Sequence, residues 1–183
     1  LAFEALQEMR VKARWEALDK ESIQIAYAKA CGKIYHAPTF ENGDSRKQLL
    51  ARSIYLLYKK ESLWTESQRI RAGILFREYP DLKKAYYLSM RLGLIYHQCK
   101  HKDTALTRLA RWYDEVEKSG FLAFGRVIRS IQTHYLEIVN FFDRRSTNAA
   151  SESFNAKIKD FRTQFRGVKD RTFFLFRLTK IYA

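Results

Sequence analysis

The chain has 183 residues, 46% hydrophobic and 15% aromatic, so it is long enough and apolar enough to fold around a core. Its 34 Lys and Arg against 20 Asp and Glu give a net charge of +14, which favours a polyanionic partner, most simply nucleic acid, although a basic surface also serves solubility. No apolar run approaches the roughly 20 residues that span a bilayer, no secretory pattern is found, and two cysteines make no disulfide framework, so we expect a cytoplasmic protein without membrane contact.

Apolar residues recur at steps of three and four along most of the chain, and period-two alternation is not sustained. This pattern predicts an all-α fold. The first helix is expected from the start of the chain to about Lys29. Gly, Pro and an Asn-Gly-Asp sequence in residues 31–44 predict the longest loop, which we interpret as a flexible joint.

Four further helices are predicted before the chain reaches Gly120. The second covers residues 45–60, and the third begins at Thr65, whose TESQ sequence matches a capping box. Pro80 fits the start of the fourth helix, and the fifth has Asp103 as its expected N-cap and Gly120 as its stop. Helices joined by short turns pack as antiparallel hairpins, so we expect a helical bundle.

Three more helices complete the predicted chain. The sixth runs from Phe124 to Phe142 and is followed by a polar turn with two arginines. Asn148 is placed to cap the seventh helix, which Gly167 ends, and residues 171–182 form the eighth. We therefore divide the chain into a helical region, 1–142, and a basic C-terminal region, 143–183.

The seventh predicted helix carries two stripes on different faces. The apolar stripe consists of Phe154, Ile158, Phe161 and Phe165. The polar stripe consists of Glu152, Asn155, Lys159, Arg162 and Arg166. Residues 144–183 contain ten Lys or Arg and three acids. Their net charge of +7 is half of the net charge of the whole chain, so we expect a phosphate backbone to bind here. The alternative for Glu152 is a first-turn acid that the helix dipole favours, and the alternative for the basic stripe is a solvated face.

The terminal sequence STNAASESFNAKIKDFRTQFRGVKDRTFFLFRL resembles the signature of bacterial insertion-sequence transposases of the DDE class, the ISL-three group. That signature reads TNA-x-x-E-x-x-N-x-x-IK, followed by a basic stretch, a Gly and an apolar helix with an Arg. The residues that match around the glutamate are Asn148, Asn155, Ile158, Lys159, Gly167 and Arg177. The central part of the chain is similar to the helical segment that this group inserts before its glutamate. The resemblance thus covers most of the chain.

The resemblance implies that Glu152 is the last of three catalytic carboxylates and a ligand of Mg²⁺ or Mn²⁺, two ions being used in the intact enzyme. It implies DNA partners, the transposon ends and the target, and a homo-oligomer in the intact protein. The residues expected to bind DNA are Arg144, Arg145, Asn148, Asn155, Lys157, Lys159, Arg162 and Arg166. No aspartate of this chain has the strand context of the first two catalytic acids. We therefore expect a fragment that starts after them, is not itself an enzyme and does not hold the ions tightly.

Two other candidates have simpler readings. Trp112 is a candidate for stacking on a displaced base, as an aromatic does in some DDE transposases with helical insertions, but it adjoins the apolar stripe of its own helix, which favours core packing. His97, Cys99 and His101 are close in sequence, but no second cluster completes a zinc site. The rival to the transposase hypothesis is a non-catalytic, all-helical module that binds DNA or another protein.

Overall fold

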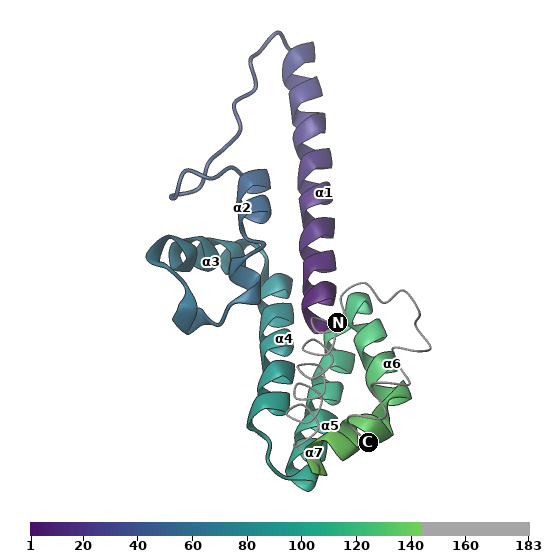
Figure 1. The fold of residues 1–183 in the computed structure, drawn as a ribbon. Helices are drawn as coiled ribbons and strands as arrows, with labels where there is room; N and C mark the ends of the chain where they lie inside the picture. The colour runs from purple at the N-terminus through teal and green to yellow at the C-terminus, as the bar shows by residue number, and fades with distance from the viewer. Residues whose placement is uncertain (144–183) are drawn as a thin grey trace, which may run out of the picture.

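The computed structural model describes residues 1–143, which form an all-helical bundle (Figure 1). The helices are α1 (Ala2–Ala30), α2 (Arg46–Arg52), α3 (Glu66–Glu78), α4 (Pro80–Gln98), α5 (Lys102–Ser119), α6 (Gly125–Thr133) and α7 (Tyr135–Asp143), with 3-10 turns at Leu56–Tyr58, Glu61–Leu63 and Leu122–Phe124. Within these residues there is no β-strand, only an isolated bridge between Thr39 and Ser45. The all-α prediction is confirmed.

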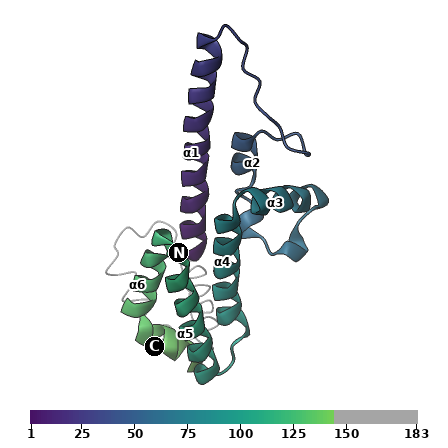
Figure 2. The ribbon, with the colours of Figure 1, turned by 180° about the vertical axis from the view of Figure 1, so that it is seen from behind.

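The longest helix, α1, has two different surroundings along its length. Its N-terminal half packs against α4 and α6, its middle lies beside α2, and its last turns project beyond the bundle (Figures 1 and 2). Helices α4 and α5 form an antiparallel hairpin, as the sequence predicts, and α3 crosses the start of α4. The loop 31–44 runs back beside the projecting half of α1 to reach α2 (Figure 1).

The core lies where the N-terminal half of α1 meets the other helices. The largest fully buried apolar side chains are Trp112, Tyr86, Phe124, Leu6, Leu49, Leu50, Leu56, Leu57, Leu75 and Val127. The polar contacts that fasten α1 to this core include three hydrogen bonds: the Ser89 hydroxyl donates to the Ala2 carbonyl (3.1 Å), Gln7 Nε2 donates to the Ile54 carbonyl (3.2 Å), and Arg10 Nη1 donates to the Leu50 carbonyl (2.8 Å). Since Leu50 lies in the last turn of α2, Arg10 satisfies a carbonyl that has no partner within its own helix.

Three helix signals of the sequence are confirmed. Thr65 caps α3 through a complete capping box, because Gln68 N–H donates to Thr65 Oγ1 (3.3 Å) and Thr65 N–H donates to Gln68 Oε1 (3.2 Å). Gly120 ends α5 with φ at +68°, a left-handed conformation that favours glycine. Pro80 opens α4 as expected.

Three predicted boundaries are wrong. The second helix ends at Arg52, where the Ser53 hydroxyl donates back to the Leu49 carbonyl (2.6 Å) and the chain continues in 3-10 turns. The sixth is divided at His134 into α6 and α7. Asp103 does not cap α5, because it lies inside the first turn, where the helix dipole favours a carboxylate.

Candidate functional site

The predicted catalytic and DNA-binding residues fall almost entirely outside the described part of the chain. Glu152 lies there, as do the predicted DNA-binding residues Arg144, Arg145, Asn148, Asn155, Lys157, Lys159, Arg162 and Arg166. The seventh and eighth predicted helices lie there too. Their roles therefore stay predictions from the sequence motif.

Trp112 is the one predicted site residue that the structure describes, and it lies in the core. Its side chain is 1% exposed, and its Nε1 donates to the Leu88 carbonyl (2.8 Å) across the α4–α5 hairpin. An indole held in this way cannot stack on a base without leaving the core. The core-packing alternative therefore describes Trp112 in this structure, because burial of a large aromatic with a satisfied N–H is favourable.

The described chain ends on a firmly packed aromatic cluster. The ring of Phe142 stacks on that of Tyr96 (centroids 5.6 Å apart), and Phe141 packs against the same tyrosine at 6.0 Å. Helix α7 also packs along α5. Burial raises the pKa of the Tyr96 hydroxyl above its ordinary value. The two helices α4 and α5 thus fix the point from which the chain continues toward the Glu152 motif.

No metal site is found among residues 1–143: no three His, Cys, Asp or Glu side chains lie together in an arrangement that could hold an ion. Cys99 is buried, whereas His101 is exposed at the N-cap position of α5. Within residues 1–143, the sequence HQCKH therefore does not bring three such side chains together.

Asp44 is the centre of a charge network that the sequence interpretation missed. Its carboxylate is fully buried and accepts hydrogen bonds from Arg52 of α2, from Arg71 Nε of α3 (2.8 Å) and from Asn42 Nδ2 (2.9 Å). Burial by itself would raise the pKa of Asp44, but the bonds from Arg71 and Arg52 outweigh it and hold that pKa below its ordinary value. The network fastens the end of the loop to α2 and α3.

The signal for this network was present in the sequence but ambiguous. The Asn-Gly-Asp sequence belongs to the predicted loop 31–44, and in the structure it forms a turn: Gly43 N–H donates to the Phe40 carbonyl (2.9 Å), and Phe40 N–H donates to the Asp44 carbonyl (2.9 Å). Gly43 has φ at +78°, which favours glycine. Nothing in the sequence distinguishes a turn aspartate in water from one that two distant arginines neutralise.

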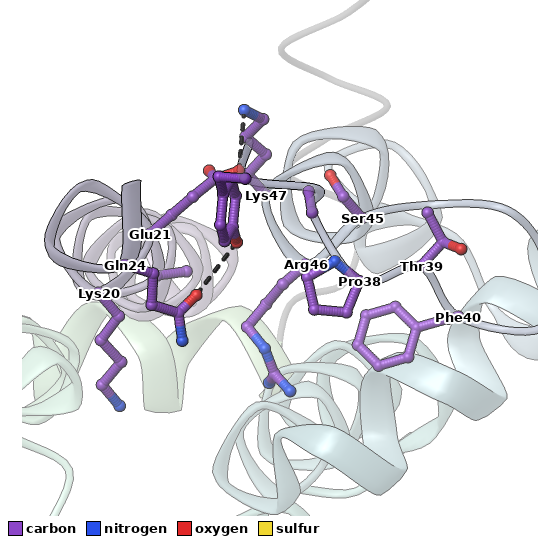
Figure 3. Close-up of a pocket in the computed structure, with 12 residues that line it drawn as sticks. Lys20, Glu21, Gln24, Pro38, Thr39, Phe40, Ser45, Arg46 and Lys47 are labelled. Carbon is purple, nitrogen blue, oxygen red and sulfur yellow. Dashed lines mark hydrogen bonds and ion pairs between the residues drawn. The ribbon is translucent and has the colours of Figure 1, made fainter. Parts of the chain in front are cut away.

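A cavity of about 240 Å³ lies between α1, the loop and the start of α2 (Figure 3). Ion pairs and hydrogen bonds cross it: Lys47 Nζ lies 3.2 Å from Glu21 Oε1, and the Tyr35 hydroxyl donates to Gln24 Oε1 (3.0 Å). The Arg46 guanidinium lies over the rings of Phe40 and Tyr79, 5.4 and 5.8 Å from their centroids.

Two of the three cations that line this cavity have an acidic partner. Arg46 also pairs with Glu78 (3.0 Å), and its hydrogen bond to the Tyr79 hydroxyl is the main reason that its pKa is raised. The lining offers no nucleophile with an adjacent base and no set of metal ligands. We therefore interpret the contacts around this cavity as those that hold the middle of α1 to α2, and we do not interpret the cavity as a catalytic site.

The described residues thus form a helical bundle. In the sequence, a basic segment that contains Glu152 follows this bundle. Comparison with protein families identifies the family of the chain: residues 1–178 match the family DDE_Tnp_ISL3, described as Transposase. Since the match covers nearly the whole chain, the protein belongs to this transposase family. The resemblance to the ISL-three group is confirmed.

Comparisons with curated proteins and with solved structures found no match. Family membership implies DNA as the partner, and transposases of the DDE class generally use divalent metal ions. Over the described residues, none of the helices combines the length and the apolar character that crossing a bilayer requires.

Proposed function

We propose that this chain is part of an enzyme that cleaves and transfers DNA strands, and that Glu152 is one of its catalytic carboxylates. The observation that supports the proposal is the family match, which extends through residue 178 and so includes the TNAASE sequence around Glu152. The basic residues that follow Glu152 add to it, because cations beside the reacting phosphate bind and orient the DNA backbone.

The donor chemistry of the motif fits a hard divalent cation. A glutamate supplies the carboxylate oxygens that Mg²⁺ and Mn²⁺ prefer, and Mg²⁺ commonly takes only one or two protein carboxylates beside phosphate oxygens. When bound, such ions polarise the attacking oxygen and stabilise the leaving oxygen. Glu152 would hold one ion, Asn148 and Asn155 would shape the site, and Lys157, Lys159, Arg162 and Arg166 would bind phosphates.

The helical region has a supporting part in this proposal. It packs α7 onto α4 and α5 through Phe141 and Phe142, so the chain enters the catalytic segment from a fixed position. The helical region itself provides no reacting group.

The experiment compares strand cleavage by the intact protein and by its Glu152→Gln variant, on DNA that carries the ends of its element, with Mg²⁺ or Mn²⁺. The substitution keeps the shape and hydrogen bonding of the side chain and removes its charge. We expect cleavage to fall by a factor on the order of 100 or more while DNA binding is retained. The matched control is Glu137→Gln, an exposed glutamate of α7.

Unchanged cleavage by Glu152→Gln would contradict the site. Loss of cleavage in both glutamine variants would attribute the effect to the fold and not to Glu152. If the wild-type protein binds DNA but cleaves no substrate under any metal condition, the rival hypothesis of a non-catalytic DNA-binding module is favoured.

A further inference from the structure

The projecting end of the molecule carries a surface that the proposed site does not use. We define the arm as residues 22–39, the last turns of α1 and the loop that follows them (Figures 1 and 2). Only Ala28 and Tyr35 of these residues are even partly buried. Four large apolar side chains of the arm are exposed to solvent: Ile23 (69%), Ile25 (46%), Tyr27 (73%) and Ile34 (84%).

The arm is a built element, held at both of its ends. Lys33 N–H donates to the Ala28 carbonyl (2.8 Å) and Gly32 N–H donates to the Lys29 carbonyl (3.1 Å), with Gly32 at φ +66°. This is the paired bonding of a Schellman motif, which closes a helix end. At its other end the arm leads into the turn that Asp44 fixes to α2 and α3.

Charge changes abruptly where the arm begins. The part of α1 before it, residues 2–21, mixes acids with cations: the acids are Glu4, Glu8, Glu16, Asp19 and Glu21. Residues 22–39 contain no acid at all, and they contain Lys29, Lys33 and His36. Within the described part of the chain, neither lysine takes part in an ion pair. The helix dipole accounts for a cation in the last turn, such as Lys29, but not for Lys33 or for the absence of acids.

We propose that the arm binds DNA, with Lys29 and Lys33 contacting phosphates and Tyr27 and Ile34 packing against sugars or base edges. This inference rests on the proposed function, in which the intact protein acts on DNA. A polyanion complements a surface that bears cations and no acid, whereas two copies of the arm facing each other would repel. Exposed apolar side chains on the same arm as the cations fit a partner that presents both phosphate and apolar edges.

The test measures DNA binding by the intact protein with a fluorescent duplex over a series of salt concentrations. The arm variant is Lys29→Gln with Lys33→Gln. Each phosphate contact contributes about 0.9 to the slope of log affinity against log salt, so we expect the slope to fall by about 2 in magnitude. The control is Lys12→Gln with Lys20→Gln, which removes the same charge from the acid-containing part of α1 and should leave the slope nearly unchanged.

A second variant separates packing from charge: Tyr27→Ala with Ile34→Ala should weaken DNA binding without changing the salt slope. Equal slopes for wild type and the lysine arm variant would overturn the proposal. So would unchanged DNA binding together with a loss of oligomers in the apolar variant, since the arm would then bind a second copy. Failure of the wild-type protein to bind DNA would instead contradict the proposed function, and normal cleavage by Glu152→Gln would contradict the catalytic site while leaving the arm inference intact.

Discussion

The two halves of α1 show how differently one continuous helix can be stabilised. The first half places Ala5, Leu6 and Arg10 inside the bundle, so tertiary packing holds it. The second half has no buried side chain after Ala17. It depends on its alanines, on the closing turn, on the hydrogen bond from Tyr35 to Gln24 and on the ion pair of Glu21 with Lys47 of α2. The first half therefore serves stability, and the second is available for a partner.

The sharpest way to break this comparison is to shorten one apolar side chain in each half. Leu6→Ala removes a fully buried leucine and should lower the free energy of unfolding by about 3 kcal/mol, whereas Ile23→Ala should change it by less than about 0.5 kcal/mol. Urea unfolding of both variants measures the difference. Equal losses would mean that the second half is buried against something in solution.

The Asp44 network gives the next largest expected effect. Asp44→Asn leaves Arg52 and Arg71 without their shared anion and should lower the free energy of unfolding by about 3 kcal/mol, because the Asp44 carboxylate is buried. An exposed pair is the control: Glu66→Gln removes the partner of Arg69 and should cost less than about 1 kcal/mol. The comparison fails if the two variants are equally stable, since the loop that carries the arm would then not depend on Asp44.

Acid pH provides an independent check on the same carboxylate. The folded-state pKa of Asp44 lies below its ordinary value, so Asp44 stabilises the fold above that ordinary value and the stabilisation is lost as pH falls through the folded pKa. Wild-type stability should therefore decrease more steeply than that of Asp44→Asn below a pH of about 4. Parallel pH profiles would show that Asp44 is not neutralised by its arginines in solution.

The smallest expected effect tests whether Trp112 belongs to the core and not to the DNA-binding surface. Trp112→Phe removes the hydrogen bond to the Leu88 carbonyl and should cost about 2 kcal/mol. DNA affinity of the intact protein, measured where the variant is folded, should be unchanged. Weaker DNA binding with unchanged stability would return Trp112 to the DNA-binding residues.

Sequence patterns predicted the features that local physics determines. The first helix, the capping box at Thr65, the proline at Pro80 and the glycine stop at Gly120 each depend on residues within one turn. The early end of the second helix depends only in part on a local bond, from Ser53 to the Leu49 carbonyl. It depends also on Arg10, which reaches the Leu50 carbonyl from 40 residues away, and a local pattern does not predict such a contact.

The candidate site shows the same difference between features that depend on neighbouring residues and features that depend on distant ones. The terminal motif could be recognised because its residues are close in sequence, and the family match supports it. Burial of Trp112 was foreseen only as one of two alternatives, since a stripe of apolar residues does not say which members are covered. The Asp44 network was missed, because Arg52 and Arg71 are 8 and 27 residues away and only the fold brings them together.

The measurement that tests the central proposal most directly is the single-turnover rate of DNA strand cleavage by the intact protein. This rate is compared between the wild type and two variants of Glu152. Glu152→Asp keeps the negative charge with a shorter reach, and Glu152→Gln keeps the reach without the charge. A metal-binding carboxylate predicts residual cleavage with aspartate, more in Mn²⁺ than in Mg²⁺ because Mg²⁺ demands stricter geometry, and almost none with glutamine. Cleavage by the glutamine variant at the wild-type rate would contradict a catalytic role for Glu152.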